Sequence, residues 1–332
     1  MYILCFKNLN RKMKLAYRNI PVLVLGYNRP SHIKKLINSL KIIRPKKIYI
    51  SLDGPKKKIK DIDKCNLVKD QIDKIDWNCE IKKNYNSNNL GCKESVSKGI
   101  KWFFKNNKFG IILEDDCIPN RTFFHFCYKI NQIYKDNKKI FSISGSNFFN
   151  QKIEEDYYFS KYAHCWGWAT WRRAWKHYDH NLSFWEKWKN SNSWKSLHKN
   201  EIERKYWEKI IDKVKKNKIN SWAYIWTCSV WKKNGISIIP KKNLIKNVGF
   251  DIQGTNSLKV EKKHLKAYSI DFKKNLKRPK VINTLELNDA YVFKNHFQGK
   301  YYLWPWIIIK IIKLLLSNPK IFVLKIIRKF HL

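Results

Sequence analysis

Apolar and polar positions alternate in a regular way from residue 20 onward. Residues 20–25 form a short continuous apolar run before a glycine, and such a run predicts a strand that is buried on both faces. Ser31 is placed to cap the next segment, whose apolar side chains recur at helical spacing between 33 and 40. Residues 47–52 then predict a second strand, which the turn residues 53–55 close.

The same alternation continues through the first half of the chain. The pattern predicts helices at 61–75, 96–104 and 123–134, and strands at 77–81, 109–113 and 140–144. Strands and helices that alternate at this spacing form βαβ units, so the expected fold is α/β with a mostly parallel central sheet. Because ligands bind beyond the carboxyl ends of such strands, functional residues are expected near 26–30, 53 and 114–116.

The second half of the chain is rich in tryptophan between 162 and 231, and no repeat or low-complexity linker separates it from the first. We therefore expect one domain over 20–258 that consists of two halves. The predicted boundaries are an N-terminal tail at 1–19, the two halves at 20–145 and 146–258, a connecting segment at 259–300 and an apolar, basic segment at 301–332.

The composition indicates a folded and very basic protein. There are 69 Lys and Arg against 26 Asp and Glu, which gives a net charge of +43, while 44% of the residues are hydrophobic and 15% aromatic. That apolar content excludes a disordered polycation. The charge favours an anionic partner such as nucleic acid, a membrane surface or a phosphorylated substrate, but a compositional bias towards Lys, Asn and Ile explains it equally well.

Cysteine spacing and terminal segments bear on the compartment. The eight cysteines include no CxxC pair and no repeated spacing, so neither a zinc site nor a disulfide framework is expected. The apolar stretch 1–6 is too short for a signal-peptide core, and no apolar run reaches the length of about 18 residues that a membrane span requires. Residues 301–332 contain no acidic residue, which favours amphipathic helices on an anionic membrane surface over a helix docked on the core. We expect a cytoplasmic protein that is peripheral on the inner face of the membrane.

Three consecutive carboxylates, Glu114, Asp115 and Asp116, follow the apolar strand 111–113. Like charges held together at the end of a buried strand are unfavourable unless a cation neutralises them. Carboxylate oxygens favour Mg²⁺ or Mn²⁺, which commonly bridge to substrate phosphates. The alternative is an acidic turn that caps the next helix.

Five segments together resemble a known family. They are 26–30 (GYNRP), 89–93 (NLGCK), 111–119 (IILEDDCIP), 165–173 (CWGWATWRR) and 243–250 (NLIKNVGF). The chain resembles, over about residues 20–257, bacterial GT-A glycosyltransferases of the broad family 2 type, related to the animal N-acetylglucosaminyltransferase I group. The resemblance implies a GT-A fold and a metal-dependent transfer of a sugar, typically from a UDP-sugar, to a glycan or lipid-linked acceptor in cell-surface polysaccharide or lipopolysaccharide synthesis. The half 20–145 would then bind the nucleotide sugar and 146–258 the acceptor.

The resemblance also implies roles for individual residues. Asp116 would be the direct ligand of Mn²⁺ or Mg²⁺, and Asp115 and Glu114 would hold the ribose or metal-bound waters. Asp53 would bond to the nucleotide base, and Arg29 would contact the nucleotide, unless it is a plain surface arginine at a helix start. A bound divalent ion stabilises the negative charge that develops on the leaving diphosphate.

An inverting transfer by direct displacement needs a general base for the acceptor proton. The stretch 184–188 (FWEKW) resembles the Trp-Asp-Asp-Trp stretch of the animal enzymes, so Glu186 is the expected base, with Asp179 and Asp251 as alternatives and a plain surface glutamate as the ordinary explanation. The chain departs from the family at Ala223, where an Asp often stands, and at Asn256, where many relatives have a His.

Other residues of the second half permit two interpretations. Most of seven tryptophans are expected in the core, with one or two in contact with acceptor sugars: Trp166, Trp168, Trp171, Trp175, Trp185, Trp188 and Trp194. Of these, Trp168, Trp171 and Trp175 stand at helical spacing. Arg172 and Arg173 are either solvated or directed at a diphosphate.

Three other functions compete with glycosyl transfer. A basic nucleic-acid-binding protein would use the charge and the aromatics, but no nucleic-acid motif appears. A sugar nucleotidyltransferase would need a glycine-rich first loop, and residues 26–30 contain one glycine. A non-catalytic module that binds membranes or sugars is the third alternative.

Overall fold

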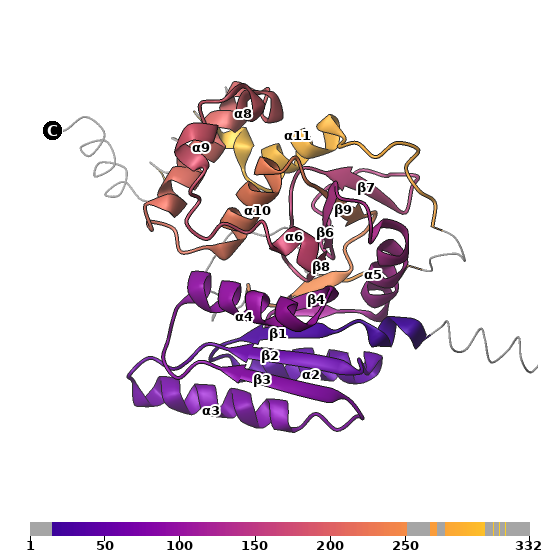
Figure 1. Cartoon of the computed structure of the whole chain (residues 1–332), viewed down its shortest axis with the longest axis vertical. Helices are drawn as coiled ribbons and strands as arrows, with labels where there is room; N and C mark the ends of the chain where they lie inside the picture. Colours follow the sequence, from indigo (N-terminus) through magenta and orange to yellow (C-terminus); the bar gives the residue numbers. More distant parts are fainter. Residues whose placement is uncertain are drawn as a thin grey trace, which may run out of the picture.

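A computed structural model describes residues 15–250, 266–270 and 276–302, together with Ile308, Ile312 and Leu316. In this part of the chain, eight strands form one sheet in the order β3-β2-β1-β4-β8-β6-β9-β7 (Figure 1). Their bounds are β1 (Val22–Gly26), β2 (Lys47–Leu52), β3 (Glu80–Tyr85), β4 (Phe109–Glu114), β6 (Ile140–Ser144), β7 (Tyr157–Ser160), β8 (Trp168–Trp171) and β9 (Ile236–Pro240).

The sheet is mostly parallel, as the sequence predicts. Strands β3, β2, β1 and β4 are parallel to one another, β8 is antiparallel to both β4 and β6, β9 is parallel to β6, and β7 is antiparallel to β9. Only β8 and β7 among these strands therefore run against the others. Strand β8, from the second predicted half, lies between β4 and β6 of the first half and makes the sheet continuous. A separate two-stranded sheet pairs β5 (Cys117–Pro119) with β10 (Ile245–Asn247).

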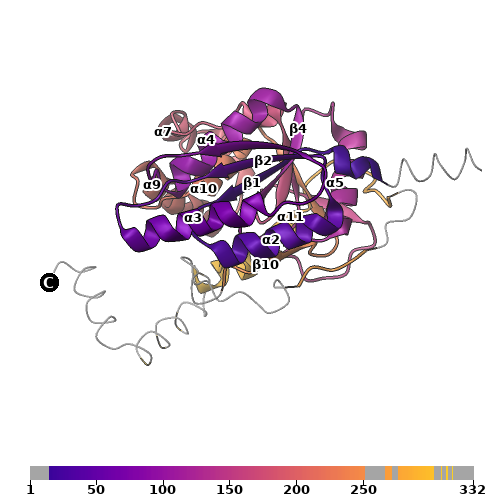
Figure 2. The same ribbon diagram turned by 90° about the horizontal axis from the view of Figure 1, so that it is seen from below.

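Helices cover both faces of the sheet. The helices of the first half are α2 (Pro30–Ile43), α3 (Ile59–Asp73), α4 (Cys92–Asn106) and α5 (Arg121–Tyr134). One apolar cluster joins α2, α3 and α5 to the sheet, and another joins α4 and α10 (Trp222–Lys232) to its other face. Figure 2 shows α2 and α3 on the side of the sheet that lies away from α4. Because both faces of the sheet are covered, successive side chains of β1 are buried on opposite faces. Val22 and Val24 pack in the first cluster, and Leu23 and Leu25 pack in the second.

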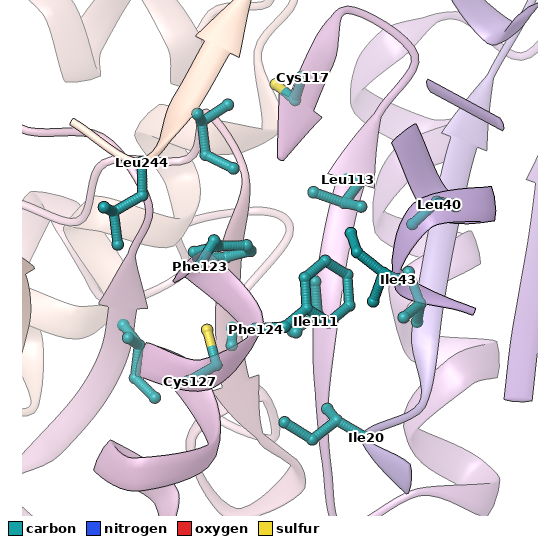
Figure 3. Packing of buried hydrophobic residues seen from close by; sticks show 14 of the residues in the cluster. Ile20, Leu40, Ile43, Ile111, Leu113, Cys117, Phe123, Phe124, Cys127 and Leu244 are labelled. Carbon is teal, nitrogen blue, oxygen red and sulfur yellow. The ribbon is translucent and has the colours of Figure 1, made fainter. Parts of the chain in front are cut away.

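Figure 3 shows the first cluster from close by. Phe123 and Phe124 of α5 pack in one cluster with Ile111 of β4, and Leu40 and Ile43 of α2 join this cluster on the same face of the sheet. All five side chains are almost fully buried. The strand that ends in the three carboxylates is thus packed on this face by large apolar side chains from two helices.

Two local predictions differ from the structure near the N-terminus. Helix α2 begins at Pro30 with Arg29 as its N-cap, so Ser31 lies in the first turn and makes no cap. Proline is favoured at the first helical position because its fixed φ suits the helix and its missing N–H would be unpaired there. The strand expected at 77–81 is β3, which begins at Glu80, because the register pairs Lys47 with Glu80 at the sheet edge.

The tryptophan-rich half adds four further helices, which are α6 (Arg172–Trp175), α7 (Trp185–Trp188), α8 (Asn192–Leu197) and α9 (Glu201–Lys215). Outside this half lie α11 (Glu286–Asn295) and the 3₁₀ turns η1 (Ala16–Asn19) and η3 (Gly299–Tyr302). Trp168 and Trp171, expected at helical spacing, are the two ends of β8 and pack on opposite faces of the sheet. Six of the seven tryptophans are buried, as expected, and Trp166 alone of the seven is partly exposed.

The C-terminal part adds α11 and three isolated described positions. Asp289 of α11, in the segment 259–300, accepts hydrogen bonds from the Ser160 hydroxyl and the Lys161 amide, so this helix packs on the end of β7. Of the segment 301–332, most lies outside the described residues, but Ile308, Ile312 and Leu316 are helical and exposed. Within the described residues, no helix is both long and apolar enough to cross a bilayer.

Candidate functional site

The carboxylates lie where the strand order of the sheet reverses. The chain passes from β1 outward to β2 and β3 and returns on the other side of β1 as β4. Leu25 of β1 is in register with Glu114 of β4, so the loops that leave the two strands begin side by side. In open α/β sheets, ligands bind at the carboxyl ends of strands at such a reversal. Arg29 follows β1, and Asp115 and Asp116 follow β4, at this position.

The guanidinium of Arg29 bridges two of the three carboxylates. Its Nε donates to Asp115 Oδ2 at 3.1 Å and one terminal nitrogen donates to Asp115 Oδ1, while the other donates to Asp116 Oδ2 at 3.3 Å. The side chain of Asp115 is 2% exposed and that of Asp116 is 20% exposed. Arg29, which the resemblance places in contact with the nucleotide, therefore contacts two of the carboxylates directly.

Burial and like charge make this group of carboxylates unfavourable without a cation. Burial, with the neighbouring charges of Asp116 and Asp115, raises the pKa of Glu114 to about 8, and the Trp222 side chain hydrogen-bonds to it. Burial also raises the pKa of Asp115 to about 6, although Arg29 opposes the shift. Each raised pKa means that the environment disfavours the ionised form. A cation at this place relieves that cost.

The capping alternative for the acidic triplet is wrong. Helix α5 is capped by Asn120, whose side-chain oxygen accepts a hydrogen bond from the Phe123 amide at 3.0 Å. The three acidic side chains therefore play no part in the helix start, and their clustering needs another explanation.

Asp116 is held against the turn that follows β10. Its carbonyl accepts from the Val248 amide at 2.9 Å, and its Oδ1 accepts from the Cys117 thiol at 3.3 Å. A Cβ at Gly249 would lie 2.5 Å from Asp116 Oδ2, so only glycine permits this approach. The turn packs closely around a carboxylate that is still partly exposed.

Asp53 follows β2 and is almost fully buried. Its Oδ1 accepts from the amides of Gly54 and Leu90, both at 2.9 Å, and its Oδ2 accepts from the Gly91 amide at 2.9 Å and from Asn89 Nδ2 at 3.0 Å. A further donor, Asn86 Nδ2, lies 3.4 Å from Oδ1. A carboxylate has about four acceptor positions. Protein donors fill these positions, so the geometry favours a role in holding the 86–91 loop over the predicted contact with a base.

Glu186 is not among the contacts of the carboxylate cluster. It lies on α7 with 58% of its side chain exposed and pairs with Lys189 at 2.7 Å and with Lys215 at 3.7 Å. The hydrogen bond from Lys189 lowers its pKa. Of its alternatives, Asp179 accepts from the amide and hydroxyl of Ser183 within its own loop.

The chain departs from the family at Ala223 and at Asn256, and the structure describes only the first of these two positions. Ala223 lies in α10, directly after the tryptophan that bonds to Glu114, and packs on the apolar cluster of that face. Asn256 lies outside the described residues, and so does Asp251, the remaining alternative base.

Trp166 lies at the same edge of the sheet as the carboxylates. It lies two residues before Trp168, the first residue of β8, which pairs with Ile112 near the carboxyl end of β4. Its ring contacts Phe250, which follows the glycine beside Asp116, with centroids 5.2 Å apart. Phe148 and His296 complete an aromatic group, with their own rings stacked at 3.6 Å. Sequence reasoning missed His296, because it lies in the segment expected only to connect, and no motif marks it.

Arg172 and Arg173 lie at the opposite edge of the sheet. Trp171, just before them, pairs with Phe109 at the amino end of β4. Arg172 Nε donates to the Asn107 carbonyl, and Arg173 donates to three main-chain carbonyls. The interpretation that they contact a diphosphate is wrong, because β8 runs antiparallel and carries them away from the site.

The donor set fits a divalent ion only in a limited way. Among the described residues, no group of three or more His, Cys, Asp or Glu side chains converges to hold a metal. Asp116, however, presents a partly exposed carboxylate, and Mg²⁺ is commonly bound by one or two carboxylates together with substrate phosphates. The residues fit an ion that arrives with a diphosphate and do not form a closed cage.

Comparisons with known proteins do not identify a family. No family model matches the chain, and no curated protein matches it. Among solved structures, the chain is similar to the 4-diphosphocytidyl-2C-methyl-D-erythritol synthase of Anaerococcus prevotii, with 12% identity over 53% of this chain and 78% of the other, at a TM-score of 0.29. A likeness of that size carries no argument about function. The chain is an α/β protein with a mostly parallel sheet, and three consecutive acids, of which Asp115 is buried, lie at its strand-order reversal.

Proposed function

We propose that this protein is a glycosyltransferase, which transfers a sugar from a nucleotide diphosphate to a hydroxyl of a glycan or lipid-linked acceptor. The observation that carries the proposal is the contact of Arg29 with Asp115 and Asp116 at the reversal of the strand order. This arrangement puts an anion-binding guanidinium beside a partly exposed carboxylate, at the edge where open α/β sheets bind nucleotides. It agrees with the motifs that resemble GT-A enzymes.

The donor side of the mechanism follows from these groups. Asp116 would hold Mn²⁺ or Mg²⁺ together with the diphosphate, and the ion would neutralise the charge that develops on the leaving oxygen. Arg29 would donate hydrogen bonds to the same diphosphate, and its planar fork suits phosphate oxygens. Asp115, which is 2% exposed, holds Arg29 through two hydrogen bonds, and Glu114 would hold the ribose or metal-bound waters.

The acceptor side would be formed around Trp166. An indole presents a broad apolar face on which the C–H face of a sugar packs. Trp166 is partly exposed and lies at the same edge of the sheet as the carboxylates. Glu186 has no place in this arrangement, since its lysine partners and lowered pKa make it a poor proton acceptor.

A membrane surface is the proposed second partner. Ile308, Ile312 and Leu316 are apolar, exposed and spaced by four residues, which places them on one side of a helix. The segment 301–332 contains several lysines and an arginine but no acidic residue. An apolar helix side with cationic neighbours binds anionic lipid surfaces, and a lipid-linked acceptor is found there.

Calorimetric titration with UDP and other nucleoside diphosphates, with and without Mn²⁺, tests the proposal. Wild-type protein should bind a nucleotide in a Mn²⁺-dependent way, and Asp116→Asn should lose that dependence. Asp76→Asn is the matched control, because Asp76 pairs with Lys41 on the exposed surface. Donor hydrolysis or transfer should then follow the same pattern. Absence of binding for every nucleotide, or an Asp116→Asn variant that behaves as wild type, would contradict the proposal.

A further inference from the structure

The two carboxylates that share Arg29 bind it unequally. Asp115 receives two hydrogen bonds in the fork arrangement and is nearly inaccessible to solvent. Asp116 receives one hydrogen bond of 3.3 Å and is ten times as exposed, at 20% against 2%. Bidentate, buried pairs between guanidinium and carboxylate are the strong ones, and single long contacts are weak. The contact with Asp116 is therefore the one that can break.

The main chain of Arg29 is fixed, so only its side chain can respond to a ligand. As the N-cap of α2, its carbonyl accepts from the amides of His32 and Ile33 at 3.2 and 3.1 Å. Rotation of the guanidinium about its fork with Asp115 is the movement that leaves this helix start and the buried pair intact. Such a rotation removes one N–H from Asp116 and turns it towards the open side of the site.

Asp116 Oδ2 is the atom at which two cations compete. The Arg29 contact uses this oxygen, and Gly249 lies so close to it that an added Cβ would be 2.5 Å away. Its partner Oδ1 already accepts from the Cys117 thiol. A divalent ion that binds Asp116 through Oδ2 has to take the place of the guanidinium nitrogen.

We propose that Arg29 is the resident counter-ion of Asp116, and that it exchanges with a divalent ion when the nucleotide diphosphate binds. In the exchanged state Arg29 stays on Asp115 and donates its freed N–H to the diphosphate. Asp115 is then a positioning residue for the arginine. The part of this inference that concerns the diphosphate rests on the proposed function.

The exchange makes the two ligands interdependent. A metal ion alone must displace a guanidinium and gains one carboxylate, so it binds weakly. A metal ion that arrives with a diphosphate also supplies a new acceptor for the displaced N–H groups. Because coupling between two ligands is reciprocal, the nucleotide should raise the affinity for the ion as much as the ion raises the affinity for the nucleotide.

Titration of the full chain with Mn²⁺ alone, followed by electron paramagnetic resonance, tests the counter-ion role without any activity assay. Arg29→Gln removes the competitor and should bind Mn²⁺ about tenfold more tightly than wild type, the equivalent of one lost charge-assisted hydrogen bond. Arg29→Lys keeps a charge that cannot span both carboxylates and should lie between the two. Equal or weaker binding of Mn²⁺ by Arg29→Gln would overturn the proposal.

Thermal unfolding gives a second measure. Arg29→Gln should unfold at a lower temperature than wild type in the absence of metal, because Asp115 and Asp116 lose their paired cation, and Mn²⁺ should restore the unfolding temperature. Mn²⁺ should change the wild type much less. If Arg29→Gln does not fold, Arg29→Lys carries the test, and a Mn²⁺ affinity no higher than that of wild type contradicts the exchange.

Nucleotide titrations of the same proteins separate this inference from the proposed function. Tighter Mn²⁺ binding by Arg29→Gln without nucleotide binding by any variant would support the counter-ion role and refute the glycosyltransferase. Metal-dependent binding of a nucleoside diphosphate by wild type, with unchanged Mn²⁺ affinity in Arg29→Gln, would refute the exchange and leave the glycosyltransferase. When both hold, Arg29→Gln should also bind the diphosphate more weakly.

Discussion

Replacement of Asp53 by asparagine tests whether this residue holds the 86–91 loop or binds a base. The carboxylate accepts four close hydrogen bonds, two at each oxygen, and three of these come from main-chain amides. In Asp53→Asn one oxygen becomes an NH₂ group, so two N–H donors face a donor where they had an acceptor. The Gly91 amide and the Asn89 side chain lose their acceptor in the orientation that keeps Oδ1 in place.

The expected cost follows from these contacts. Hydrogen bonds to charged groups contribute about 1.5–3 kcal/mol each, and a buried donor without a partner costs about 1–3 kcal/mol. Since part of the loop can relax towards water, we expect the free energy of unfolding to fall by about 2–4 kcal/mol. The loop precedes α4, so amide hydrogen exchange at 86–91 should also accelerate.

Urea unfolding followed by tryptophan fluorescence measures the change, and Asp63→Asn on the exposed side of α3 is the matched control. A change below about 0.5 kcal/mol in Asp53→Asn, with normal loop exchange, would refute the positioning role. If nucleotide affinity nevertheless falls in such a stable variant, Asp53 binds the base, as the resemblance implies.

Three further predictions concern the site, the expected base and acid stability. Gly249→Ala should lose metal-dependent nucleotide binding while it remains folded, because its Cβ would lie 2.5 Å from Asp116 Oδ2; calorimetry and circular dichroism check this, and normal binding would contradict the close approach. Glu186→Gln should keep its transfer rate within about twofold, since an exposed carboxylate paired with lysines is poorly placed as a base; a loss of about a hundredfold would restore it as the base. The contribution of the buried His198–Glu203 pair to stability should fall as the pH drops below about 6.5, because burial lowers the pKa of His198 to about 4 and, against the opposing effect of burial, partners including His198 and Lys161 lower the pKa of Glu203 to about 2. The folded protein favours the neutral imidazole, so the contribution of His198 to stability is lost between pH 6.5 and 4, and that of the ionised Glu203 is lost between about pH 4.5 and 2. Glu203→Gln should therefore flatten the acid side of a plot of unfolding midpoint against pH. An unchanged profile would refute the assignment.

The sequence was sufficient for the elements whose environment is the same along their whole length. Strands β1 and β4 were predicted from apolar runs and β2 from a mostly apolar stretch closed by turn residues, and such runs arise because helices cover both faces of the sheet. The position of the three carboxylates directly after β4 followed from the same pattern. Edge strand β3 was displaced in the prediction, because its mostly polar residues carry little periodic signal.

Local periodicity was misleading where a distant pairing decides the structure. Trp168 and Trp171 have helical spacing, yet they belong to β8, because the gap between β4 and β6 is filled by an antiparallel strand. That choice also moves Arg172 and Arg173 to the edge opposite the carboxylates. The sequence of a four-residue segment does not determine which strands it pairs with on either side.

The site itself divides in the same way. The sequence determined that three acids end a buried strand and that Arg29 follows the first strand, since both are facts of local order along the chain. Only the tertiary structure decided that Arg29 reaches Asp115 across 86 residues, and that Gly249 closes on Asp116. Side-chain hydrogen bonds between distant segments depend on the strand register and the direction of each loop, and neither leaves a periodic trace in the sequence.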